Sequence, residues 1–172
     1  MLKELLQGKW LGHPLHPALV HVPVGLFPTA LLCDILSRSG IGGNVLVQTG
    51  FCCILVGLIV SLLAAPAGLA DWLEIKSGRP AYRIGLWHMV LNLIVVVLFA
   101  INLALRWNRF RSQLKVEITP LILSALGTAI LLASAYLGSL MVFDQGIGIA
   151  RMSKGKWRKL AVAGRSNTPD ES

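Results

Sequence analysis

Three of the four histidines of this chain lie in one twelve-residue stretch, GHPLHPALVHVP, at positions 12–23. His13, His16 and His21 share the stretch with three of the chain's eight prolines. Imidazole nitrogens ligate zinc, copper and iron, including haem iron, and they exchange protons near neutral pH. The spacing therefore gives a histidine-rich candidate site at the start of the apolar segment that follows.

The fourth histidine, His88, lies at a matching depth in another apolar run. Helices that begin at Pro17 and Ile84 place His21 and His88 four residues inside, about 6 Å below the helix starts. Both runs start from the same side of the predicted bundle, so we expect the two imidazoles to face each other at one level. Ionisable residues within membrane helices face a bundle interior or a cavity, and they mark candidate functional sites.

Further polar residues are predicted at this level. Asn92 lies one turn beyond His88, and Asn102 lies about 40° from His88 around the same helix. His88, Asn92, Phe99 and Asn102 are therefore expected to form one stripe. Asp71 ends the second apolar run on the same side of the bundle.

The composition requires a membrane. Hydrophobic residues make up 55% of the 172-residue chain and charged residues only 14%, whereas soluble domains carry about a quarter charged residues. A hydrocarbon layer of about 30 Å takes roughly 20 helical residues to cross, and four runs have that length. We predict an all-α membrane protein with four transmembrane helices in an up-and-down bundle. The spans are 17–36, 45–67, 84–105 and 120–143.

The distribution of positive charge predicts the orientation. Eleven of the sixteen lysines and arginines fall on the side that carries both termini and the second loop. Because positive residues favour the cytoplasm, we expect a multi-pass protein of the bacterial cytoplasmic (inner) membrane with both termini inside. The predicted organisation is an N-terminal segment with the HPLHP motif (1–16), a four-helix transmembrane domain (17–150) and a basic, partly disordered cytoplasmic tail (151–172).

The first span also contains Pro23, Pro28 and Asp34. Each proline lacks an amide donor and frees a carbonyl one turn earlier, so the helix is expected to bend near His21. Asp34 lies about 220° around the helix from His21 and close to its far end. We therefore predict that Asp34 is an interfacial carboxylate near Arg38, outside the histidine site.

Four features of the sequence resemble one protein family. They are the motifs HPLHPALVHVPVGL and AAPAGLADWLEI, the pair His88 and Asn92, and the late segment YLGSLMVF before QGIG. It is the uncharacterised bacterial membrane family of domain of unknown function 2231, and the resemblance covers residues 10–150. The resemblance implies four transmembrane helices. Some relatives carry Rieske iron–sulfur domains alongside, which implies a link to electron transfer.

One interpretation is a b-type haem protein in electron transfer. His21 and His88 would be the axial ligands, with Asn92 nearby and Asp71 orienting one imidazole. The basic residues of the second loop that would reach the haem propionates are Arg79 and Arg83. A quinol or a Rieske-type or other redox partner would supply electrons.

A second interpretation is a site for a zinc, copper or iron ion, built from His13, His16, His21 and His88. A third is a membrane scaffold or partner subunit with no cofactor, in which the histidines only satisfy helix carbonyls. The residues leave these three interpretations open, and they fit either a monomer or a homo-oligomer in the lipid bilayer.

The basic residues flank apolar runs and form no continuous patch, so no nucleic-acid partner is expected. The chain contains no G-x-S-x-G, H-E-x-x-H or Walker motif. Catalytic residues are therefore not predicted, and enzymatic activity is left open.

Overall fold

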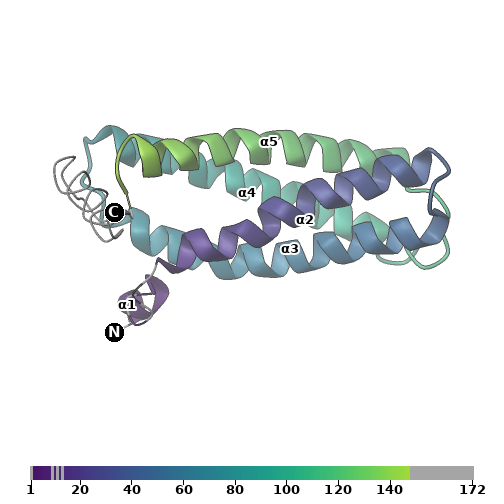
Figure 1. Ribbon diagram of the computed structural model, residues 1–172, viewed down its shortest axis with the longest axis horizontal. Coiled ribbons are helices and arrows are strands. Elements are labelled where there is room, and N and C mark those ends of the chain that lie inside the picture. Colours follow the sequence, from purple (N-terminus) through teal and green to yellow (C-terminus); the bar gives the residue numbers. More distant parts are fainter. Residues whose placement is uncertain (1, 9, 11, 13, 148–172) are drawn as a thin grey trace, which may run out of the picture.

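The computed structural model describes residues 2–8, 10, 12 and 14–147 (Figure 1). Within those residues it contains helices and no strands, which confirms the all-α prediction. The tail at 151–172 lies outside the described residues. The helices are α1 (Leu2–Leu6), α2 (Leu15–Arg38), α3 (Gly43–Trp72), α4 (Pro80–Arg106) and α5 (Ile118–Phe143).

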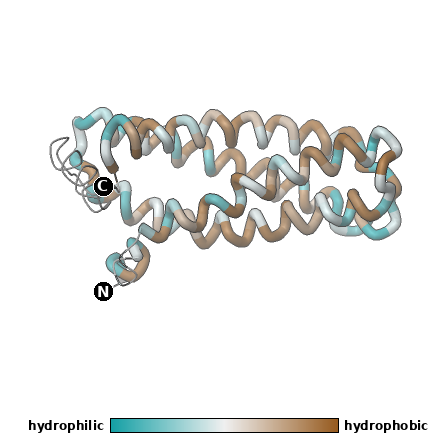
Figure 2. Tube along the Cα trace, viewed as in Figure 1, coloured by the Kyte–Doolittle hydropathy of each residue, from teal (hydrophilic) through white to brown (hydrophobic). Residues whose placement is uncertain are grey.

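Helices α2 to α5 are long enough and apolar enough to cross a membrane. Their 24 to 30 residues correspond to about 36–45 Å of helix. Large apolar side chains on their outer surfaces, such as Leu62, Leu93 and Leu132, remain 60–65% exposed, as expected for residues that face lipid. Hydrophobic residues dominate the long helices, and hydrophilic residues gather towards the two ends (Figure 2). The prediction of four long apolar helices is thereby confirmed, and each helix extends beyond its predicted span by up to seven residues in all.

The ends of these helices follow local backbone chemistry. Pro80 is the first residue of α4, where its missing amide hydrogen has no helical partner to lose. Gly42, at the start of α3, has a φ of +70°, a conformation that favours glycine. A four-residue turn at 39–42 therefore joins α2 to α3.

The four long helices run alternately up and down (Figure 1). Helix α1, the 73–79 loop and the end of α5 lie at one end of the bundle. The 39–42 turn and the 107–117 loop lie at the other end. The start of α2 and the end of α5 thus lie at the same end of the bundle, as expected for an even number of alternating helices.

The bundle consists of two helical hairpins. Helices α2 and α3 share an extensive interface, as do α4 and α5, while smaller interfaces join α2 to α5 and α3 to α4. Helices α2 and α4 therefore lie diagonally across the bundle. They run parallel and approach each other through side chains near the bundle axis.

The two hairpins repeat each other's buried positions. Four of the six residues buried in α2 have buried counterparts 72 positions later in α4: Pro23 and Val95, Phe27 and Phe99, Ala30 and Asn102, Asp34 and Arg106. Five of the nine residues buried in α3 have buried counterparts 70 positions later in α5: Gly50 and Pro120, Ile54 and Ser124, Gly57 and Gly127, Leu58 and Thr128, Ala64 and Ser134. This correspondence relates the hairpins by an approximate twofold axis along the bundle.

The middle of the bundle is filled by two counterpart rings. The rings of Phe27 and Phe99 stack with centroids 4.0 Å apart and planes 10° apart. A Cβ added at Gly57 would lie 2.5 Å from the Phe27 ring, and one at Gly127 would lie 2.7 Å from the Phe99 ring. Each ring is therefore packed against the backbone of its own hairpin partner, which requires glycine there.

Substitution of Gly57 by alanine tests this packing. We expect Gly57→Ala to destabilise the folded bundle by about 1–3 kcal/mol, because the new methyl group must displace a buried ring. Gly25→Ala is the matched control, since a Cβ at Gly25 meets nothing within 4 Å. Thermal unfolding in detergent should show a lower midpoint for the first variant alone. Equal midpoints for the two variants would contradict the packing described.

Candidate functional site

Two histidines approach each other at the end of the bundle where α2 and α4 begin. The rings of His16 and His88 have centroids 6.3 Å apart and planes at 87°. They are counterpart residues, 72 positions apart like the stacked phenylalanines. We call His16 and His88 the histidine pair.

Each imidazole of the histidine pair is anchored in the same way. Nδ1 of His16 donates to the carbonyl oxygen of Ala64 (2.9 Å), and Nδ1 of His88 donates to that of Ser134 (2.8 Å). Because a carbonyl oxygen only accepts, the proton of each neutral ring belongs on Nδ1. The lone pair is then on Nε2, which is the atom available to a metal or to a hydrogen-bond donor.

Polar groups of α4 and α5 hold His88 further. The Asn92 amide nitrogen lies 3.0 Å from His88 Nε2 and 2.9 Å from the His88 carbonyl oxygen, and it donates to both. The Ser134 hydroxyl donates to the same carbonyl oxygen (3.2 Å) and lies 3.1 Å from Nδ1. The His88 ring is therefore fixed at both nitrogens.

Glycines bring both rings close to a neighbouring helix. A Cβ at Gly68 of α3 would lie 2.7 Å from the His16 ring, and one at Gly138 of α5 would lie 3.1 Å from the His88 ring. Gly68 and Gly138 are again 70 positions apart. The approximate twofold axis thus relates the two imidazole rings, their hydrogen bonds to main-chain carbonyls and the glycines against which they pack.

The prediction that His21 faces His88 is wrong. His21 is exposed on the outside of α2, and its Nδ1 donates to the carbonyl oxygen of Pro17 in the same helix (2.5 Å). Helix α2 begins at Leu15 and includes His16, because Pro17 is tolerated in the first turn. His16 and His21 then point about 140° apart at 100° per residue, so only one of them can face the axis. That residue is His16.

The remaining predicted site residues divide between the two ends. Asp71 lies in the last turn of α3, and Arg79 and Arg83 are exposed at the start of α4, all at the end that holds the histidine pair. His13 lies outside the described residues. In the part of the chain that the structure describes, no group of three or more histidine, cysteine, aspartate or glutamate residues is placed to hold a metal ion.

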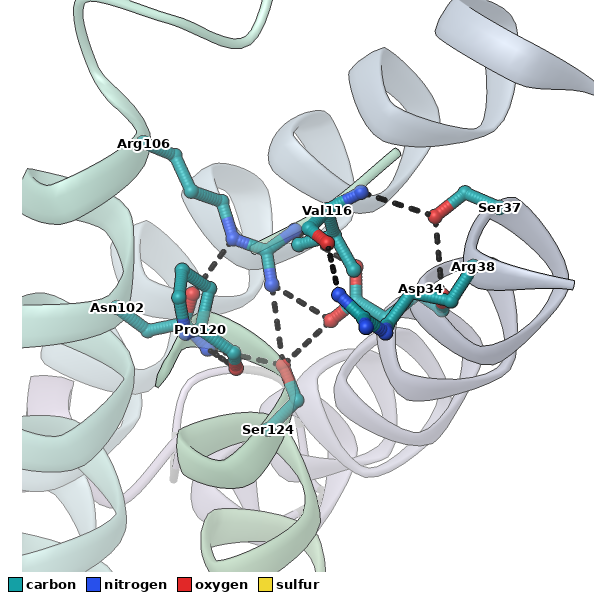
Figure 3. A network of polar contacts seen from close by, with 8 residues as sticks. All are labelled: Asp34, Ser37, Arg38, Asn102, Arg106, Val116, Pro120 and Ser124. Atoms are coloured by element: carbon teal, nitrogen blue, oxygen red, sulfur yellow. Dashed lines mark hydrogen bonds and ion pairs between the residues drawn. The ribbon is translucent and has the colours of Figure 1, made fainter. Parts of the chain in front are cut away.

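A second polar site, which sequence reasoning missed, lies at the opposite end of the bundle. Asp34 and Arg106 are 0% and 1% exposed. The Arg106 guanidinium donates two hydrogen bonds to the Asp34 carboxylate, from Nη1 to Oδ1 (2.7 Å) and from Nη2 to Oδ2 (2.6 Å), which makes a bidentate pair (Figure 3). The prediction of an interfacial Asp34 near Arg38 is wrong, because Arg38 instead donates to the carbonyl oxygen of Val116 (2.9 Å).

Neighbouring polar groups complete this network. The Ser124 hydroxyl donates to Asp34 Oδ2 (2.7 Å), and Arg106 Nε donates to the Asn102 side-chain oxygen (2.6 Å). Asn102 in turn donates to Ser124 and to the Pro120 carbonyl, both at 2.9 Å. Asn102 therefore belongs to this network and is not part of the His88 stripe. The buried charges have the hydrogen bonds that make an ion pair tolerable away from water.

Removal of one partner tests how far the fold depends on this pair. We expect Asp34→Ala and Arg106→Ala each to destabilise the bundle by about 3–5 kcal/mol, because each leaves a buried charge without its counter-ion. Arg38→Ala, one turn from Asp34 and exposed, should change stability by less than about 1 kcal/mol. Denaturant unfolding in mixed micelles provides the measurement, and similar losses for all three variants would show that burial of the pair is not the cause.

Comparison with known proteins adds one finding. No curated protein and no solved structure matches the chain. A family model described as "Predicted membrane protein (DUF2231)" matches residues 12–151. That range contains all four long helices and both polar sites. The chain therefore belongs to the membrane protein family of domain of unknown function 2231, as the sequence resemblance indicated.

Proposed function

We propose that this membrane protein binds a b-type haem between His16 and His88 and carries electrons within the bilayer. The observation that carries the proposal is the histidine pair itself: two imidazoles, anchored alike, on diagonal helices and 6.3 Å apart. When bound, haem would supply a one-electron couple. The chain's own part would be to hold the iron through the imidazole nitrogens of His16 and His88.

The separation of the rings supports this proposal. A metal–imidazole bond is about 2 Å long, so two imidazoles that ligate one metal have centroids up to roughly 6 Å apart. The centroids of His16 and His88 are separated by 6.3 Å. Diagonal helices are also suited to this task, because a ligand between them lies on the bundle axis.

The hydrogen bonds of the rings also support it. Histidines that ligate metals usually donate their other ring nitrogen to a carbonyl or carboxylate, which fixes the ring and raises the basicity of the ligating nitrogen. Both Nδ1 atoms of the histidine pair donate to main-chain carbonyls. Binding would require the Asn92 amide to leave Nε2 of His88.

The number of protein donors favours haem over a bare metal ion. A structural zinc site takes four protein ligands and a catalytic one takes three. Haem brings four ring nitrogens and needs only two axial ligands. Within the described residues, the two imidazoles are not joined by further candidate ligands, which is why the zinc, copper or iron ion site is the weaker proposal.

Residues around the histidine pair have roles in this proposal. Arg79 and Arg83, exposed at the same end, would pair with the propionates of the haem. Asp71 would shape the electrostatic field of the site from the end of α3. A quinol or a Rieske-type iron–sulfur protein is the class of redox partner that suits a one-electron carrier in a membrane.

One observation favours a second candidate function, a membrane subunit without a cofactor. Asn92 already donates to the Nε2 of His88, so that ring has partners at both nitrogens without any ligand. In this case the histidine pair would only join α2 to α3 and α4 to α5. The two candidates differ in whether the purified protein contains iron.

The visible spectrum of the untagged protein, purified from haem-replete cells, distinguishes them. We expect a reduced-minus-oxidised spectrum with the bands of a six-coordinate b-type haem, and loss of these bands in His16→Ala and in His88→Ala. His21→Ala is the matched control and should keep the spectrum, because His21 faces outwards.

Two outcomes count against the haem proposal. A wild-type protein without haem absorption would favour the subunit without a cofactor, and metal analysis of the same sample would detect a bare ion. A spectrum that survives both His16→Ala and His88→Ala would assign the haem to other ligands.

A further inference from the structure

Helices α2 and α4 meet across the bundle axis in three layers. The first is the histidine pair, the second is the Phe27–Phe99 stack, and the third is the Asp34–Arg106 ion pair. In each layer the two residues are 72 positions apart. The first two layers pair identical residues, and the third pairs opposite charges.

The first two layers do not determine which helices pair. If α2 of one molecule met α2 of a second copy, histidine would still face histidine and phenylalanine would still face phenylalanine. The glycines against these rings also have counterparts in both hairpins, Gly57 with Gly127 and Gly68 with Gly138. A bundle made from two copies of the same hairpin would therefore keep these contacts.

The third layer differs between the two arrangements. Pairing α2 with α2 of a second copy would bring two Asp34 carboxylates together, and pairing α4 with α4 would bring two Arg106 guanidiniums together. Both positions are fully buried. Juxtaposed like charges are strongly unfavourable in such surroundings, and they have no solvent to screen them.

We propose that the Asp34–Arg106 pair selects how the two hairpins associate. It favours the α2–α3 hairpin against the α4–α5 hairpin of the same chain, and it excludes association of like hairpins from two copies. A buried ion pair adds little net stability compared with apolar residues of similar size, so selection of the pairing explains its presence better than stability does. The inference concerns assembly and does not depend on the proposed function.

Charge reversal in the full-length chain tests this inference. In Asp34→Arg both positions of the third layer are arginine, and in Arg106→Asp both are aspartate, so neither chain can pair its own hairpins. When the two variants are co-expressed, every hairpin of one finds an opposite charge on the other. Two copies with different affinity tags, purified in sequence through both tags, report whether the variants assemble with each other.

We expect the complementary variants to capture each other at least about tenfold more than either variant captures a second copy of itself. Capture between two wild-type copies should be equally low. Arg38→Asp, an exposed reversal one turn away, is the matched control and should behave as wild type. Each variant is expected to fold poorly when expressed alone. The decisive readout is therefore whether co-expression with the complementary variant restores folding. Capture no greater for the complementary pair than for either variant with itself, or an Asp34→Arg chain as stable as wild type, would overturn the inference.

Discussion

The two hairpins are joined across the bundle axis by side-chain contacts between α2 and α4. In a membrane, the lipid tails are as apolar as the helices, so burial of apolar surface does little to bring helices together. Close packing and internal polar contacts must do so instead. Here both are concentrated on the axis: glycines let rings lie against neighbouring backbones, and each end carries a polar layer.

The approximate twofold symmetry places counterpart residues opposite each other in both polar layers. The two layers differ because their counterpart residues are identical at one end and oppositely charged at the other. At one end the counterpart positions are both histidine, which gives two equivalent nitrogen donors and suits a ligand on the axis. At the other end they are aspartate and arginine, which pair with each other and with Ser124 and Asn102. The symmetric layer is therefore the better candidate for binding, and the asymmetric layer is the better candidate for specifying the fold.

The sequence predicted the parts of this arrangement that depend on hydrophobic length. The four apolar runs predicted four membrane helices, and the position of His88 within its run placed it in the interior. The choice of the inward histidine in α2 depended on helix phase, because a start at Leu15 instead of Pro17 brings His16 into the first turn. A residue before proline usually lies outside helical geometry, but His16, in the first turn of α2, is helical although Pro17 follows it.

The buried ion pair was missed for a different reason. Asp34 and Arg106 each lie near the end of an apolar run, where a charged residue ordinarily reaches the headgroups. Their partnership links positions 72 apart in the sequence and appears only when the hairpins are compared. The common offset of His16 and His88, of Phe27 and Phe99, and of Asp34 and Arg106 was the available signal.

The proposed function requires that His16 and His88 together ligate one haem iron. Electron paramagnetic resonance of the oxidised protein in native membranes, with ¹⁵N-labelled histidine, measures this most directly. Ligation by both rings would give a low-spin ferric signal coupled to two histidine nitrogens, reduced to one coupled nitrogen when either His16 or His88 is replaced. A high-spin signal, or coupling unaffected by both replacements, would contradict it.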